Sequence, residues 1–381
     1  MRDQSVVGET VDRLFSPLTA NPADPQPGKS VGILVGVTLA GQRYYFRFGK
    51  VDLNDSGSVD IKDIVFFIGS NSKVVTATLL ALAPGETNGP VGPFTHVSSL
   101  LPSDVTVRQP YGDILLWHLA THSASFPDGV CGPRPAFGDY PFSSMGQFLD
   151  TFEPSYGPGR YWVYSNQGFA LLGVLLSHAY AGGKTSSDWD ETYENWPTLA
   201  IEKVTSPLGM KTTQVAYQAV AAQVAQGYNY SDKGSTPVYN PVSPPNWVMT
   251  SAGLGAGALS STLNDMLTFL EMEISPPKGA LGTAIKTTQQ AYPGSDTLSM
   301  GLGWQLGNDY LDKDGGLGGY QTYMAFDPSR KVGVFVFGNT SGGRVGGVLT
   351  GTGRKLLGEL RGLPAEPSNF PHPTTIPQCP A

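Results

Sequence analysis

Ser70 and Lys73 are the first residues along the chain whose types and spacing could support covalent chemistry. A separation of three residues puts both side chains on one face of a helix. The N-terminus of that helix would favour a serine alkoxide, and a desolvated lysine can lose its proton and become the base that an isolated serine needs. Alone, the motif fits a serine N-cap beside a solvated lysine equally well.

Tyr164 and Asn166 form the second motif, just before an apolar segment. A phenol held near two ammonium groups can carry a proton between nucleophile and leaving group, and an amide can position substrate or lysine. Taken alone, Tyr164 is equally well explained as a core tyrosine with a satisfied hydroxyl group.

The third motif is Lys313-Asp314-Gly315, and Gly316 follows it directly. A lysine on an edge strand, followed by glycines that let a substrate approach the backbone closely, suits a site for an oxyanion and a carboxylate.

Each motif occurs a second time in an unsuitable context. Two prolines between Ser275 and Lys278 forbid a helix. Residues 193–195 repeat Tyr-x-Asn in a polar stretch, and residues 331–333 repeat Lys-x-Gly in a turn. Order and context therefore distinguish the first set, and together the three motifs are far more specific than any one of them.

The surrounding elements predict an α+β protein. Runs of β-branched and aromatic residues predict strands at both ends of the chain, and helical patterns lie between and after them. The expected strands cover residues 31–39, 43–49, 320–326 and 332–337, and the expected helices cover residues 73–83, 168–178, 262–272 and 346–360. We expect one antiparallel sheet built from both chain ends and flanked by helices, with a large, mostly helical insertion.

This pattern predicts a discontinuous domain organisation. Residues 1–69 and 292–365 would form the sheet domain, and residues 70–291 a helical domain carrying the nucleophile helix and the Tyr-x-Asn loop. Residues 366–381 would be a proline-rich tail.

With these motifs in this order, the chain resembles the serine β-lactamase and penicillin-binding-protein superfamily, and within it class C β-lactamases and family VIII carboxylesterases. The resemblance covers nearly the whole chain. Residues 119–124 (LATHSA) are similar to a family stretch that reads LATYTAG, and three further segments are typical of the group: residues 27–31, 207–210 and 301–304.

The resemblance implies a β-lactamase-like fold and a role for each motif. It implies Ser70 as nucleophile, Lys73 and Tyr164 as the proton-handling pair, and Asn166 and Lys313 as supporting groups. It also implies an oxyanion hole formed by the backbone N–H groups of Ser70 and Gly316, with no cofactor.

Asp314 departs from the pattern, because β-lactamases of this family have Lys-Thr-Gly. A carboxylate facing the cleft would repel a substrate carboxylate, although pairing with Lys313 would weaken that repulsion. We therefore expect a serine hydrolase that forms an acyl-enzyme with small carboxylic esters, with weak β-lactam hydrolysis as a side activity. The alternatives are a class C-like β-lactamase, a D-amino-acid amidase or peptidase in which Asp314 binds an amine, and a penicillin-recognising sensor without turnover.

Composition excludes several other classes. The net charge is −7 and only 14% of residues are charged, which argues against nucleic acid as a partner. The five histidines form no ligand motif, so no metal site is expected. Residues 52–63 imitate a calcium loop, but a strand precedes them and Asp63 replaces the usual bidentate glutamate. We interpret them as a solvated turn.

No apolar run is long enough to span a bilayer, and the first residues lack the apolar core of a signal peptide. A periplasmic or secreted protein whose leader has been removed is favoured over a cytosolic one. Cys131 and Cys379 are the only cysteines. The sequence does not decide whether they pair, and it does not indicate an oligomeric state.

Overall fold

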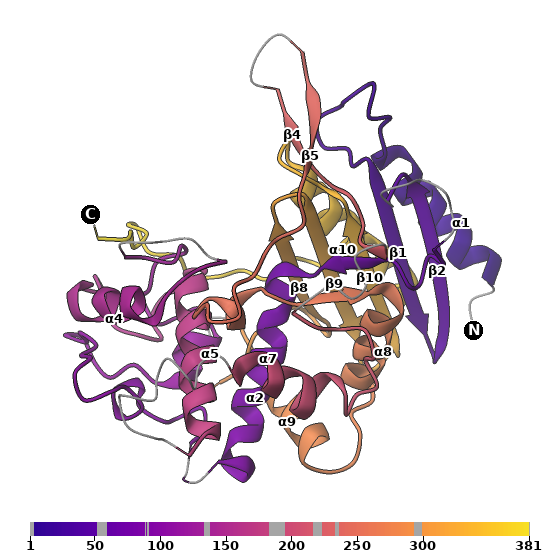
Figure 1. Cartoon of the computed structure of the whole chain (residues 1–381). Coiled ribbons are helices and arrows are strands. Elements are labelled where there is room, and N and C mark those ends of the chain that lie inside the picture. Colours follow the sequence, from indigo (N-terminus) through magenta and orange to yellow (C-terminus); the bar gives the residue numbers. More distant parts are fainter. Residues whose placement is uncertain are drawn as a thin grey trace.

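A six-stranded antiparallel sheet is the centre of the computed structural model, which describes residues 4–51, 59–87, 89, 91–132, 138–182, 195–215, 223–232, 236–292 and 299–380. The strand order is β2-β1-β10-β9-β8-β7 (Figure 1). These strands are β1 (Gly32–Leu39), β2 (Gln42–Gly49), β7 (Gln305–Leu306), β8 (Leu311–Leu317), β9 (Tyr320–Asp327) and β10 (Val332–Gly338). Both chain ends contribute, because β1 pairs with β10.

Side chains alternate between the two faces of this sheet, as the period of a strand requires. Ile33, Val35 and Val37 pack toward α1 (Gln4–Phe15) and α10 (Val345–Arg361) on one face. The other face is covered by α8 (Leu263–Ile274), which contacts β1 and β10 (Figure 1). The sheet is therefore a buried layer between helices.

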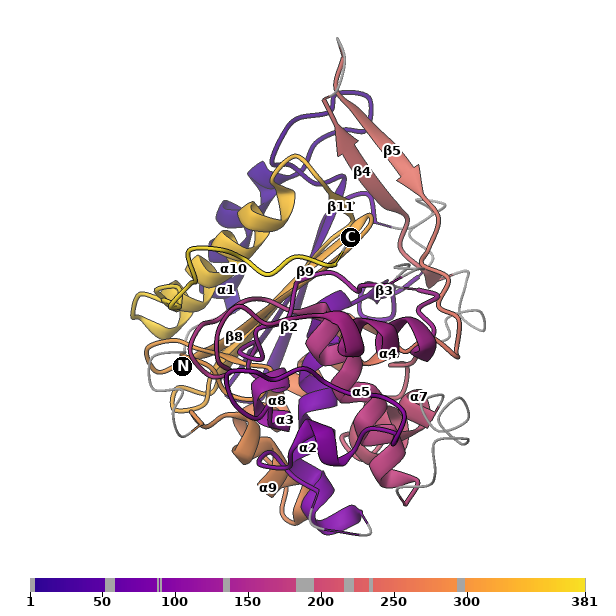
Figure 2. The same cartoon turned by 90° about the vertical axis from the view of Figure 1, so that its left-hand side faces the viewer.

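A mostly helical part lies beside the sheet and carries two long buried helices, α2 and α5 (Figures 1 and 2). The Oγ atom of Ser165 accepts a hydrogen bond of 2.9 Å from the Gly168 N–H group and caps α5. The α-helices of this part are α2 (Ser72–Glu86), α3 (Leu116–Ala120), α4 (Phe142–Thr151), α5 (Asn166–Tyr180), α7 (Trp196–Leu199) and α9 (Ala280–Thr288).

Smaller elements connect these parts. Short helical turns are η1 (Ser16–Leu18), η2 (Gly69–Asn71), η3 (Val97–Ser99), η6 (Ala200–Thr205) and η8 (Leu254–Ala256). The remaining strands are β3 (Val65–Phe67), β4 (Gly227–Ser231), β5 (Val238–Val242), β6 (Ser260–Thr262) and β11 (Thr340–Ser341). The β4–β5 hairpin projects from the molecule (Figure 1).

The expected α+β architecture is confirmed, with an antiparallel sheet from both chain ends. All four predicted strands and all four predicted helices are present, with bounds shifted by at most a few residues. The sequence analysis missed α1 and the β4–β5 hairpin. The division at residues 69/70 and 291/292 stays a proposal; within the 70–291 segment, α8 is a helix that packs on the sheet.

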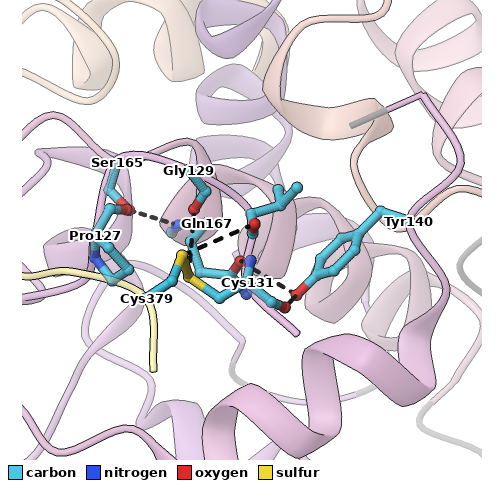
Figure 3. The surroundings of a disulfide bond; sticks show 9 residues. Pro127, Gly129, Cys131, Tyr140, Ser165, Gln167 and Cys379 are labelled. Carbon is cyan, nitrogen blue, oxygen red and sulfur yellow. Dashed lines mark hydrogen bonds between the residues drawn. A yellow bond between two sulfur atoms is a disulfide. The ribbon is translucent and has the colours of Figure 1, made fainter. Parts of the chain in front are cut away.

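The proline-rich tail leaves α10 and crosses to the helical part (Figure 2). There the ring of Phe370 stacks on Trp162 with centroids 4.4 Å apart, and the backbone N–H group of Trp162 donates to the Pro371 carbonyl oxygen. A disulfide between Cys131 and Cys379 fixes the end of the tail (Figure 3). The two cysteines therefore pair, which the sequence had left open.

Candidate active site

Ser70 lies in the turn η2, directly before α2, where it is half-buried. Gly69 adopts φ +51°, and a Cβ atom there would lie 2.8 Å from the backbone nitrogen of Gly316. Only glycine therefore permits the turn to approach β8 this closely. The Thr322 hydroxyl donates to the Ile68 carbonyl oxygen at 3.0 Å and fixes the turn to β9.

Lys73 lies one turn further along, with its side chain fully buried. Its ammonium group has three donors, and three acceptors surround it: Ser70 Oγ at 3.0 Å, Asn166 Oδ1 at 2.7 Å and the Ala256 carbonyl oxygen at 2.5 Å. None of these acceptors is charged. Burial, followed by repulsion from Lys313, therefore lowers the pKa of Lys73 well below its usual value.

Tyr164 precedes α5 and donates its hydroxyl hydrogen to Ser70 Oγ. Both lysine nitrogens lie over its ring, Lys73 Nζ at 5.0 Å and Lys313 Nζ at 5.2 Å from the centroid. Burial raises the pKa of Tyr164, and the Lys313 ammonium opposes that rise. The phenol therefore begins the reaction protonated, and the Lys313 ammonium group favours its ionised form.

His122 packs against the ring of Tyr164 and holds the backbone next to it. Its Nδ1 atom accepts a hydrogen bond of 3.0 Å from the Ser165 N–H group, and its ring lies 4.5 Å from that of Tyr164. Burial, then Lys313 and Lys73, lowers the pKa of His122 well below its usual value. This hydrogen bond gives His122 a structural role, and the imidazole is neutral.

Lys313 reaches the site from β8 and is also buried, with 1% of its side chain exposed. Burial opposes its charge, but Asp314 and Tyr164 outweigh that effect and raise its pKa. Its Nζ atom lies 3.5 Å from Asp314 Oδ1 and donates to the Asp314 carbonyl oxygen at 2.7 Å. The Asp314 side chain is 53% exposed, and Lys313 lowers its pKa, so it is ionised at neutral pH.

Gly315 and Gly316 make the close approach between β8 and the nucleophile turn possible. A Cβ atom on Gly315 would meet the Ile68 carbonyl oxygen at 2.3 Å. The nitrogen and oxygen atoms of Gly316 both face Gly69. Among the described residues, β7 pairs only with Leu311 and Asp312, so β8 has no strand partner on this side from Lys313 onward, as expected for a lysine at a strand edge.

The structure thus brings all eight predicted site residues to one place. The second motifs do not join them: Ser275 is an exposed residue at the end of α8, Lys331 lies in the β9–β10 turn, and Tyr193 lies outside the described residues. Most of the calcium-like loop, residues 52–58, also lies outside the described part of the chain. Among the described residues, no group of three or more potential ligands could hold a metal ion.

Two functional contacts were not predicted. In the segment 253–258, Gly255 packs against Gly173 of α5, which brings the Ala256 carbonyl oxygen to Lys73. Asp128 accepts a hydrogen bond of 3.0 Å from Asn166 Nδ2. No sequence spacing marks Asp128, although it lies four residues after the LATHSA segment.

A polarised hydroxyl with two proton-handling partners and nearby backbone N–H groups can attack a carbonyl group and stabilise the resulting oxyanion. No helix of the described residues is long and apolar enough to cross a membrane.

Comparison with known proteins agrees with this chemistry. A family model described as Beta-lactamase matches residues 11–357. The chain is 25% identical over 371 residues to a beta-lactamase of Pseudomonas fluorescens, covering 87% of this chain and 93% of that protein. It is 27% identical over 331 residues to the D-alanyl-D-alanine-carboxypeptidase/endopeptidase AmpH of Escherichia coli K12, covering 81% of this chain and 79% of that protein.

Solved structures share the fold. A class C beta-lactamase superposes with a TM-score of 0.71 at 22% identity, covering 94% of this chain and 98% of that chain. The D-alanine carboxypeptidase AmpC from Burkholderia cenocepacia gives a TM-score of 0.70 at 23% identity, covering 94% of this chain and 100% of that chain.

Proposed function

Because the chain belongs to the Beta-lactamase family of serine hydrolases, we propose that Ser70 forms an acyl-enzyme with small, uncharged carboxylic esters. The observation that carries the substrate class is Asp314. It is an ionised, half-exposed carboxylate paired with Lys313, the buried lysine that reaches the site from β8. A substrate carboxylate would meet a neutral ion pair there instead of a free ammonium group, so an uncharged ester is favoured.

In the proposed reaction, Ser70 Oγ attacks the ester carbonyl carbon while Lys73, in its neutral amine form, takes up the Ser70 proton. Lys73 and Tyr164 both already contact Ser70 Oγ. The N–H groups of Ser70 and Gly316 stabilise the oxyanion. When the C–O bond breaks, Tyr164 donates its own proton to the leaving alkoxide and Lys73 returns one to the phenol. Water then hydrolyses the acyl-enzyme along the reverse proton path.

A second candidate is an amidase or peptidase for D-amino-acid derivatives that carry a free amine. Asp314 and Asp128 both lie close enough to influence the charge of Lys73, and Asp128 is exposed. Two carboxylates beside one nucleophile would attract an ammonium group and repel an anion. The names of the similar proteins point to β-lactams and D-alanyl peptides, which we propose to be weaker substrates of this chain.

We also propose that the protein works outside the cytosol, in the periplasm or as a secreted protein. The disulfide between Cys131 and Cys379 supports this location, because disulfides persist in oxidising compartments.

A substrate panel tests the proposal. The value of kcat/KM is measured for p-nitrophenyl butyrate, nitrocefin and a D-aminoacyl p-nitroanilide, with Ser70→Ala as the blank. The ester should be the best substrate. A higher value for nitrocefin would replace the proposal with a β-lactamase, and a higher value for the anilide would replace it with an amidase. A single burst without steady turnover would identify a sensor.

A further inference from the structure

Asn166 is held between two groups of opposite character. Its Oδ1 atom accepts a hydrogen bond of 2.7 Å from Lys73 Nζ, and its Nδ2 atom donates one of 3.0 Å to Asp128 Oδ1. An ammonium group can only donate and a carboxylate can only accept. The amide therefore satisfies both neighbours in one orientation and neither after a 180° flip.

We propose that Asp128 is a positioning residue for catalysis: it fixes the Asn166 amide so that an acceptor, not a donor, faces Lys73. Asp128 binds the same residue a second time, because its backbone carbonyl oxygen accepts the Asn166 N–H group at 2.8 Å. Among the described residues, Asp128 makes no hydrogen bond with Ser70, Tyr164 or Lys73, so it acts through Asn166.

The segment that carries Asp128 is fixed on both sides. The Ser165 hydroxyl donates to the Pro127 carbonyl oxygen at 2.8 Å, and the Cys131 N–H group donates to Gln167 Oε1 at 3.0 Å. Three successive residues at the start of α5, 165–167, thus each hold residues 127–131. Figure 3 shows the contacts of Ser165 and Gln167. The Cys131–Cys379 disulfide adds a covalent anchor at the end of this segment.

The charge of Asp128 reaches Lys73 as well. It favours the ammonium form and partly offsets the lowering of the Lys73 pKa by burial and by Lys313. Orientation and charge can be separated by substitution. Asp128→Asn keeps an oxygen that accepts from Asn166 but removes the charge, whereas Asp128→Ala removes both.

We test this by measuring kcat/KM from pH 5 to 9 with p-nitrophenyl butyrate. Asp128→Ala should lose about tenfold to a hundredfold, the worth of one hydrogen bond to a charged group. Asp128→Asn should keep most of the activity at its optimum, and the limb of its pH profile governed by Lys73 should move to lower pH. Asp104→Asn, at an exposed carboxylate on the same half of the chain, is the matched control and should equal the wild type.

A double-mutant cycle supplies the decisive comparison. In an Asn166→Ala background, adding Asp128→Ala should change kcat/KM less than twofold, because the amide that Asp128 orients is already gone. Full additivity, or wild-type activity in Asp128→Ala, overturns the proposal. Thermal unfolding of each variant shows whether a loss of activity reflects loss of the fold. If it does, Asp128→Asn and Asp128→Ala should lose activity together.

This inference does not depend on the ester preference. If the wild type prefers nitrocefin, the ester proposal fails and the same ratios are measured with nitrocefin. If Asp128 is not a positioning residue, the kcat/KM of Asp128→Ala will equal that of the wild type with whichever substrate the wild type hydrolyses.

Discussion

The helical side and the strand side of the site each contribute one buried lysine, and the two lysines are prepared for opposite tasks. Lys73 on α2 is surrounded by uncharged acceptors, whereas Lys313 on β8 is paired with a carboxylate. Both are about 5 Å from the ring of Tyr164. Nevertheless, the pKa of Lys73 is lowered and the pKa of Lys313 is raised.

The difference shows that burial alone does not decide the charge of a lysine; the charge of its partners does. The helical side supplies a lysine that can exchange a proton with Ser70. The strand side supplies a fixed charge, and Asp314 determines how much of that charge a substrate meets. We therefore propose that chemistry depends on the first side and selectivity on the second.

The largest effect should come from the nucleophile. Ser70→Ala should fold normally and lose roughly 10⁴-fold or more in kcat, because no other described residue is placed to form the acyl-enzyme. Mass spectrometry after brief exposure to an acylating inhibitor should find the adduct on the peptide containing Ser70. Activity in the variant, or an adduct on Ser275, would place the nucleophile elsewhere.

Lys73 and Tyr164 should act as one unit on the helical side. Lys73→Met and Tyr164→Phe should each cost about as much as the double variant, because either change interrupts the same proton path. Steady-state kcat of the three variants measures this. If the two losses instead add in free energy, the groups have separate roles.

His122 should matter through geometry on the helical side. His122→Ala should lower kcat about tenfold with little change in KM, because the Ser165 N–H group loses its acceptor and the Tyr164 ring loses its neighbour. Asn tolerates the φ of +58° found here and carries an acceptor oxygen. His122→Asn should therefore restore most of the loss, and equal loss in both variants would contradict this explanation.

Asp314→Thr tests the strand side. Removing the carboxylate leaves Lys313 unpaired and adds a hydroxyl donor, so kcat/KM for nitrocefin should rise at least tenfold, about 1.4 kcal/mol. The value for p-nitrophenyl butyrate should change much less. Equal changes for both substrates would show that Asp314 does not set selectivity.

Removal of metal should have the smallest effect. Exhaustive EDTA treatment should leave kcat/KM unchanged, because the described residues contain no group of potential ligands. Loss of activity that only calcium restores would identify residues 52–63 as a calcium loop.

Much of the helical side could be predicted because its groups are close in sequence. Ser70 and Lys73 are three residues apart, and helix geometry alone puts them on one face. Strands β1, β2, β9 and β10 could be predicted equally well, because runs of β-branched and aromatic residues at both chain ends indicate strands.

The rest depends on contacts between distant segments. Asp128 reaches Asn166 from another loop, and Ala256 reaches Lys73 only because Gly255 packs against Gly173. The pairing of Cys131 with Cys379 spans 248 residues. The Asp314 side chain was identified in the sequence, but its pairing with Lys313 required the three-dimensional structure.

The pairing of β1 with β10 also determines when the protein can fold. Ile33 lies opposite Gly338, so the central sheet cannot close until nearly the whole chain has been synthesised, which takes on the order of tens of seconds. Until then the β1–β2 hairpin presents an unpaired edge, which is prone to aggregation. The hairpin therefore spends most of the synthesis time without its final partner, and a chaperone that covers its edge during that interval would suppress aggregation.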